Sequence, residues 1–226
     1  MSATRVQSKT YVTNDWLNSF NFSFTSSITA GSLLIFGVAT GASSTSVTSV
    51  TDSSGQTWSR AVSPAQTSLD GVVVDVWYLA NANSGTHTVT VNLDDYYQSA
   101  VVAREYGGIA TSTPLDITKA AADGDYEVSH LTGTSAGSTS QANTLSVVFS
   151  GGYEDGGTYT AGSGFSNAQY TASSGAMSIG MADRDDSSTG TKSGSMTTTN
   201  YIRNANVLTV FKEASVASTQ GMMLMF

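Results

Sequence analysis

The first side chains to consider for chemistry are the two histidines, His87 and His130, because imidazole is the commonest general base in enzymes. His87 lies on the apolar side of an alternating Thr-His-Thr-Val-Thr-Val segment, a position that packing explains better than catalysis. Residues 161–164, Ala-Gly-Ser-Gly, come near a nucleophile elbow, but a chain rich in Ser and Gly produces such matches by chance. Metalloprotease, phosphate-loop and dinucleotide-binding motifs are missing. The sequence therefore predicts no catalytic residue and a protein that is not an enzyme.

Two runs of carboxylates could supply oxygen ligands to Ca²⁺. The candidates are Asp123, Asp125, Glu127, Asp183, Asp185 and Asp186. Neither run follows an EF-hand loop, and Arg184 partly neutralises the second. We therefore expect solvated acidic loops and no metal or other cofactor, with Ca²⁺ as the alternative. A pair of carboxylates could instead hydrolyse a glycosidic bond, but that requires about 5–10 Å between them in a cleft.

Tyrosines in or beside loops offer a binding surface, because aromatic faces near Asn, Asp and Gly stack on sugar rings. The tyrosines concerned are Tyr96, Tyr97, Tyr153, Tyr159 and Tyr170. Tyr153 and Tyr159 lie in a Gly-rich stretch, residues 151–164, which we expect to be a long exposed loop that holds at most a short strand. These two are the candidate glycan contacts, and structural packing at the base of the loop is the alternative.

The composition favours strands over helices. Charged residues make up 12% of the 226 residues, Gly, Ser and Thr are abundant, and Cys is absent, so disulfides and thiolate metal sites are excluded. A chain of this length suits one β-domain that buries roughly 70% of its unfolded surface. The net charge of -8 repels phosphate backbones and anionic membranes. We expect no nucleic-acid partner.

No segment has the apolar length of a signal peptide or of a membrane span. We therefore expect no signal peptide and no membrane insertion. The composition, rich in Thr, Ser, Gly, Asn and Tyr and free of Cys, is nevertheless typical of proteins that work outside cells. A virion protein made in the host cytoplasm satisfies both observations.

The centre of the predicted fold is residues 31–40, which are apolar on both faces of an extended chain. Leu33 and Ile35 face one way, whereas Leu34 and Phe36 face the other. Each face needs a covering layer, which the other strands must supply.

Alternating patterns predict further strands over residues 20–24, 44–51, 72–79, 86–93, 98–106, 126–131, 143–149, 176–182 and 204–211. We expect a hairpin around the turn that Asp52 and Gly55 form before Trp58, a short turn at 120–122 and a polar turn at 183–191. The predicted class is an all-β, jelly-roll-like antiparallel sandwich of roughly ten strands. Its expected core residues are Leu34, Phe36, Val74, Val76, Val89, Val91, Val102 and Val147. No internal repeat of fixed period is found.

We divide the chain into an N-terminal arm or edge strand (1–18), the sandwich (19–213) and a C-terminal tail (214–226). The tail ends in five apolar residues, Met222, Met223, Leu224, Met225 and Phe226. Methionine adapts to irregular grooves, so these residues are candidates for docking on a neighbouring subunit. The alternative is that they fold back onto their own core.

Six segments of the chain also carry a family resemblance. They are Gly31-Ser-Leu-Leu-Ile-Phe, Val50-Thr-Asp-Ser-Ser-Gly-Gln-Thr-Trp58, Val76-Trp-Tyr-Leu-Ala-Asn81, Gly85-Thr-His-Thr-Val-Thr-Val91, Ala103-Arg-Glu-Tyr-Gly-Gly108 and Pro114-Leu-Asp116. In this order the segments resemble a β-sandwich domain of phage tail or head appendage proteins and of bacterial surface proteins. The resemblance covers residues 20–120 well and the later strands more loosely. It implies a jelly-roll-like module for display, adhesion or assembly.

The leading expectation is therefore a phage virion structural protein, such as a capsid decoration, head-fibre or tail-associated protein, that acts in assembly or surface display. Its expected partners are other virion proteins, copies of itself and, as an option, a surface glycan. The alternative is a carbohydrate-binding module or adhesin of a bacterial surface protein.

Overall fold

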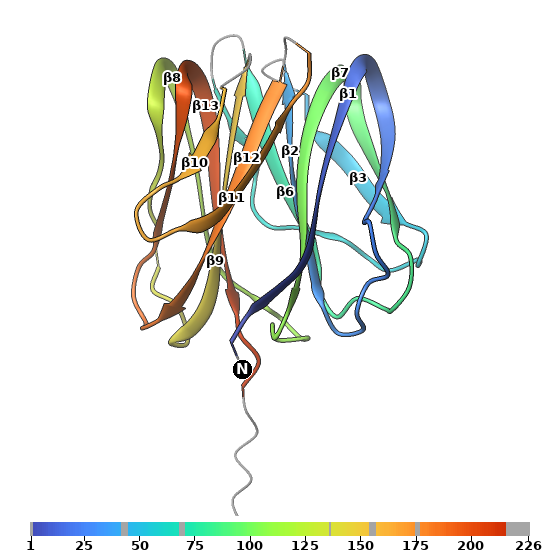
Figure 1. The fold of residues 1–226 in the computed structure, drawn as a ribbon, viewed down its shortest axis with the longest axis vertical. Helices are drawn as coiled ribbons and strands as arrows, with labels where there is room; N and C mark the ends of the chain where they lie inside the picture. Colours follow the sequence, from blue (N-terminus) through green and yellow to red (C-terminus); the bar gives the residue numbers. More distant parts are fainter. Residues whose placement is uncertain are drawn as a thin grey trace, which may run out of the picture.

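The computed structural model describes residues 2–41, 45–67, 71–135, 137–153, 157–174 and 177–215. Over these residues the chain forms two antiparallel sheets that pack face to face, and no helix (Figure 1). The predicted all-β sandwich is confirmed, with thirteen strands in place of about ten.

The first sheet contains β1 (Thr4–Ser23), β2 (Leu33–Gly41), β3 (Val47–Asp52), β4 (Ser59–Arg60), β5 (Ala65–Gln66), β6 (Val72–Leu79) and β7 (Thr88–Gly107). The second sheet contains β8 (Leu115–Thr134), β9 (Asn143–Tyr153), β10 (Tyr159–Ala161), β11 (Ser166–Ala172), β12 (Met177–Ser187) and β13 (Ser193–Lys212).

Both sheets follow the same path. The first has the order β1-β7-β2-β6, and the second has the order β8-β13-β9-β12. In each, a 20-residue first strand pairs with a 20-residue last strand. The last strand also pairs with a short one, β3 in the first sheet and β10 in the second. The protein therefore consists of two topologically equivalent halves, although the sequence has no evident repeat.

A shared irregularity aligns the two halves residue by residue. Val6 is skipped between the pairs Arg5↔Tyr106 and Gln7↔Glu105, and Asp116 is skipped between Leu115↔Phe211 and Ile117↔Val210. Positions in β8 are thus 110 higher than their equivalents in β1 (116 against 6), and positions in β13 are 105 higher than in β7 (211 against 106). Both long pairs lose register again near their middle, where the strands bend.

The bends create three hydrophobic clusters. The shared core lies between the two sheets and includes Ile35, Val147 and Phe211. Beyond its bend, each long pair folds over the outer face of its own sheet. It encloses an outer core there, around Phe36 in the first half and around Leu208 in the second.

Strand β2 shows why both layers are needed. All nine of its residues are buried, with Leu33 and Ile35 in the shared core and Leu34 and Phe36 in the outer core of the first half. The prediction that both faces of this strand are covered is confirmed.

All eight predicted core residues are buried, but they do not form one core. Val74, Val76, Val102 and Val147 lie in the shared core, whereas Leu34, Phe36, Val89 and Val91 lie in the outer core of the first half. Alternation along the sequence assigned each residue to a face of its strand. Whether the other sheet or the bent part of a long strand pair covers that face could not be read from the alternation.

Several expected turns are wrong because a strand runs through them. Residues 88–93 and 98–106, which were expected in two separate strands, belong to one bent strand, β7, and residues 120–122 lie inside β8. Strand β12 continues to Ser187, through part of the expected polar turn at 183–191, and β9 extends to Tyr153 into the expected loop at 151–164. The three-residue strand β10 is the short strand that the expected loop allowed. In the bent ribbons, backbone pairing with the neighbouring strand outweighs the local turn preference of Gly and Asp.

The hairpin expected around Asp52 is also wrong. The turn exists, with Gly55 N donating to Asp52 O at 3.1 Å, but the strands on its two sides pair with different partners. β3 pairs with β7, and β4 pairs with β6. At the N-terminus, the expected arm or edge strand is the first part of β1, an edge strand that continues without a break through Ser23.

The two ends of the molecule differ. Ser2 and Glu213 line the same hollow, and Ala214 N donates to Gly108 O at 2.8 Å, so both ends of the described chain lie together. We call this the terminal end. The bends of β1, β7, β8 and β13 lie at the opposite end (Figure 1), which we call the bend end. The predicted docking residues 222–226 lie outside the described residues. In the described part of the chain, no helix is long and apolar enough to cross a membrane.

Candidate functional site

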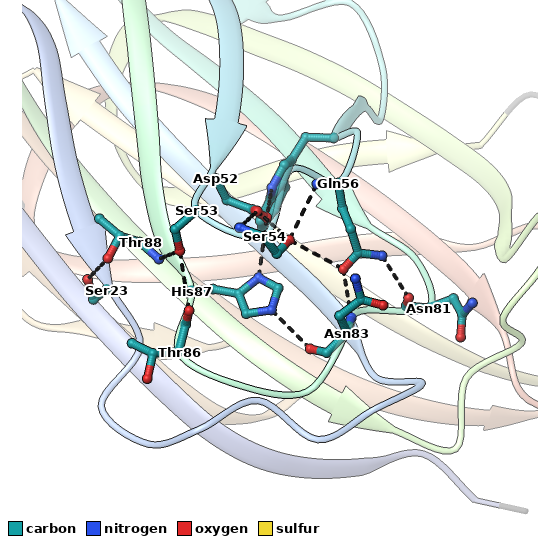
Figure 2. A network of polar contacts seen from close by, with 11 residues as sticks. Ser23, Asp52, Ser53, Ser54, Gln56, Asn81, Asn83, Thr86, His87 and Thr88 are labelled. Carbon is teal, nitrogen blue, oxygen red and sulfur yellow. Dashed lines mark hydrogen bonds and ion pairs between the residues drawn. The ribbon is translucent and has the colours of Figure 1, made fainter.

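His87 lies in a buried polar network that joins the turn after β3 to the start of β7 (Figure 2). Its Nδ1 is 3.3 Å from Asp52 Oδ2, and its Nε2 is 2.9 Å from the carbonyl oxygen of Asn83. Trp58 Nε1 donates to the same carboxylate oxygen at 2.8 Å. His87 is buried and both ring nitrogens are engaged within the protein, so the ring has no nitrogen available for a substrate.

Asp52 holds this network together. Burial by itself would raise the pKa of its carboxyl, but hydrogen bonds from Ser54, Trp58 and His87 outweigh burial, and the pKa lies below its ordinary value of 3.8. Ser54 Oγ donates to Asp52 and not to His87. The carboxylate therefore lies between the hydroxyl and the imidazole, which is the wrong order for a Ser-His-Asp triad.

The same turn is tied to the following loop by Gln56. Its Oε1 accepts from Asn83 N at 2.6 Å, and its Nε2 donates to Asn81 O at 3.0 Å. Figure 2 shows the side chains converging between the turn and the loop. These hydrogen bonds fix the turn after β3 against the loop before β7, which is a structural role.

His130 lies beside the outer core of the second half and is also fully buried. Its Nδ1 is 2.5 Å from Ser150 Oγ, and its Nε2 is 3.1 Å from Thr198 Oγ1. Burial lowers its pKa to about 4, so the ring is neutral near pH 7. The pair of Ser150 and His130 is sealed from solvent, and the geometry gives it a packing role, as expected for both histidines.

The second acidic run is not a solvated loop, because it lies in β12. Asp183 is buried against the first sheet, where Arg104 Nη1 approaches its Oδ2 at 2.6 Å and Tyr106 donates to that oxygen at 2.8 Å. Burial raises the pKa of the Tyr106 hydroxyl, which therefore remains a donor. This contact joins the two sheets.

The other carboxylates of the two runs point to separate partners. Asp186 pairs with Arg184 at 3.0 Å and Lys192 at 3.5 Å, whereas Asp185 accepts from Ser2 at 3.4 Å. The first run is not a loop either, because it lies in β8, where Asp123 accepts from the backbone N–H of Asp125. Within the described residues no three His, Asp or Glu side chains gather into a group that could hold a metal ion.

Tyr159 is not an exposed glycan contact. It is 2% exposed, its hydroxyl lies 2.8 Å from Ser178 Oγ, and its ring meets His130 edge-on at 6.0 Å. The physical reason is that β10 pairs with β13, which turns this side chain into the outer core. Tyr153 is partly buried and packs against the shared core.

Four exposed aromatic side chains lie instead at the bend end, whereas Tyr170, which is 42% exposed, lies in β11. Trp16 is 60% exposed, Tyr96 56%, Tyr126 49% and Tyr201 69%. By the alignment of the two halves, Trp16 is equivalent to Tyr126, and Tyr96 is equivalent to Tyr201. Each bent ribbon therefore carries one exposed aromatic residue on each of its two strands.

Neighbouring side chains orient two of these rings. Trp16 lies 4.7 Å from the ring of Tyr97, and the guanidinium of Arg203 lies 4.8 Å from the ring of Tyr126. Large flat faces held on paired strands are suited to contact with a partner molecule. We take these bends as the candidate functional site.

Tyr96 and Tyr97 belong to the tyrosines expected in or beside loops, whereas Trp16, Tyr126 and Tyr201 were not predicted from the sequence. A local signal existed, because each missed residue follows an acidic or amide side chain directly, as in Asp15-Trp16 and Asn200-Tyr201. An aromatic residue in such a polar setting favours a bend over a buried strand.

Comparison with protein families, curated proteins and solved structures finds no match to this chain.

Proposed function

We propose that the protein is a phage virion structural protein, such as a capsid decoration, head-fibre or tail-associated protein, that works in assembly or surface display and not as an enzyme. The observation that carries the proposal is that the two opposite ends of the molecule differ. Both ends of the described chain lie at the terminal end, and the exposed aromatic pairs lie at the bend end. An attached protein would thus present its aromatic face away from its anchor.

The edges of the sheets support a role in assembly. β1 and β8 are edge strands of 20 residues, each paired with one neighbouring strand. The free side of an edge strand can add a strand from another chain, which satisfies backbone groups in both. Copies of the protein or other virion proteins are the partners that this feature suits.

The buried polar groups support a role without catalysis. His87, His130 and Asp183 are buried side chains of the kind that enzymes use, and each is engaged by structural neighbours. A carbohydrate-binding module or adhesin is the second candidate function, and the exposed aromatic rings favour it, because such rings stack on sugars.

Assembly tests the proposal directly. The full chain and a truncated form ending at residue 215 would be compared by light scattering coupled to gel filtration and by negative-stain imaging. We expect defined symmetric assemblies of the full chain, and weaker assembly of the truncated form with an unchanged melting temperature.

A full chain that stays monomeric and attaches to no virion particle would contradict the proposal. Unfolding of the truncated form would assign residues 216–226 to the protein's own core, and normal assembly without them would exclude their docking role.

A further inference from the structure

A groove of about 400 Å³ lies between the two arms of bent strand β8. Its lining includes Lys119, Ala121, Asp123, Glu127 and Leu131, with Asn204 of β13. This volume falls within the range of about 300–1,000 Å³ that is usual for small-molecule sites.

In the first half, aromatic side chains pack together at the equivalent positions. There, Tyr11 stacks on Phe20 at 5.7 Å and on Phe22 at 6.4 Å, between the two arms of β1. The equivalent positions in β8 are Ala121, His130 and Thr132. Ala121 and Thr132 line the groove where the first half has the rings of Tyr11 and Phe22. His130 lies outside this lining and is buried against Ser150 and Thr198.

Asn204 is a buried polar group with an incomplete set of partners. It is 1% exposed, and its Oδ1 accepts from Asn206 Nδ2. Its Nδ2 has no hydrogen-bond partner among the described residues. A buried donor without an acceptor costs about 1–3 kcal/mol, so an acceptor on a ligand would be favourable here.

The lining selects a class of ligand. Asp123 and Glu127 supply acceptors, Asn204 and Lys119 supply donors, and Ala121 and Leu131 supply apolar contact. Two carboxylates against one ammonium disfavour a phosphate, and no group of three acidic or histidine side chains among the described residues could hold a metal ion. A saccharide ring offers hydroxyls that both donate and accept, together with an apolar face.

We propose that this groove is a saccharide-binding site, in which Asp123 and Glu127 accept hydrogen bonds from sugar hydroxyls and Asn204 donates one. The inference does not depend on whether the protein belongs to a virion.

The test uses the full chain on an array of bacterial cell-surface oligosaccharides, followed by calorimetric titration with the saccharide that binds best. Ala121→Tyr restores the ring that fills the first half, and Glu127→Gln removes an acceptor charge. Asp125→Asn is the matched control, because Asp125 lies on the same bend outside the groove lining. Far-UV dichroism and melting temperature establish that each variant is folded.

We expect binding by the wild type, loss of binding in Ala121→Tyr, an increase in Kd of about tenfold or more in Glu127→Gln, and an unchanged Kd in Asp125→Asn. The proposal is overturned if the folded wild type binds no saccharide on the array, or if the Kd is the same in Ala121→Tyr. Should Ala121→Tyr fail to fold, the Kd of Glu127→Gln decides, and an unchanged value rejects the site.

Discussion

At the scale of single residues, Asp75 couples stability to pH. It is 1% exposed on β6 and lies 2.9 Å from Arg60 Nη2. Burial raises its pKa from 3.8 to about 6, although the charge of Arg60 acts in the opposite direction. The folded state therefore holds the proton more tightly than the unfolded chain. This contribution to stability is fully present below pH 3.8 and is lost as the pH rises to about 6, by up to about 3 kcal/mol.

Asp75→Asn should remove this loss, because the amide carries no charge at any pH and Arg60 is exposed enough to remain solvated. We expect the variant to exceed the wild type in free energy of unfolding at pH 7.5, and the difference to shrink toward pH 4. Urea unfolding at several pH values measures this difference in free energy of unfolding. Asp94→Asn, at an exposed position, is the control. A difference that does not change with pH would contradict the assignment.

Asp52, unlike Asp75, stabilises the fold in its charged form, because burial of its carboxyl is outweighed by hydrogen bonds from neighbouring side chains, which lower its pKa. Asp52→Ala leaves Trp58 Nε1 and one nitrogen of His87 buried without an acceptor. We expect the free energy of unfolding to fall by about 2–4 kcal/mol. Asp94→Ala is the control, because this carboxylate accepts from the backbone N–H of Ser46 at an exposed site. We expect this variant to lose less than about 1 kcal/mol in free energy of unfolding. Equal losses of free energy of unfolding in the two variants would show that the buried network around Asp52 adds no more stability than an exposed hydrogen bond.

At the scale of the elements, the two central strands fit together through one small and one large residue. Gly37 of β2 and Phe149 of β9 hold equivalent positions, pairing with Val102 and Val207 in the two halves. A Cβ atom on Gly37 would lie 2.4 Å from Phe149 Cδ1, so the sheets could not keep their separation.

Gly37→Ala should therefore destabilise the protein by about 1–3 kcal/mol through overpacking. Gly137→Ala is the control, because no atom lies within 4 Å of the Cβ built at that position. Thermal unfolding of both variants tests the argument. A melting temperature of Gly37→Ala equal to that of the wild type would mean that the sheets adjust without cost.

At the scale of the whole molecule, the shared core makes the halves interdependent. It takes Ile35 and Val74 from the first half and Phe149 and Phe211 from the second. Residues 1–110 expressed alone would expose their side of this core to water. We expect this fragment to bind the dye ANS and to lack a cooperative thermal transition, and we expect co-expression with residues 111–226 to restore both properties to those of the full chain. A fragment that unfolds cooperatively on its own would show that each half is an independent domain.

The sequence by itself determined the class of fold, the faces of the strands and the structural role of the histidines. A period of two assigns side chains such as Leu33 and Leu34 to opposite faces, whatever the strand pairs with, because alternation is a local property of extended chain. The same reasoning placed His87 on an apolar face, and this residue is buried directly before β7 begins at Thr88.

The tertiary structure alone decided which strands pair, where the long strands bend and which layer covers each face. These depend on contacts between distant residues, such as Arg104 with Asp183, that local patterns do not encode. The equivalence of the two halves was hidden for the same reason. The two halves share their strand registers and the positions of the skipped residues Val6 and Asp116. The side chains at equivalent positions differ, as Tyr11 and Ala121 do. That difference is also why the groove could not be predicted, since it arises where one half lacks the rings that fill the other.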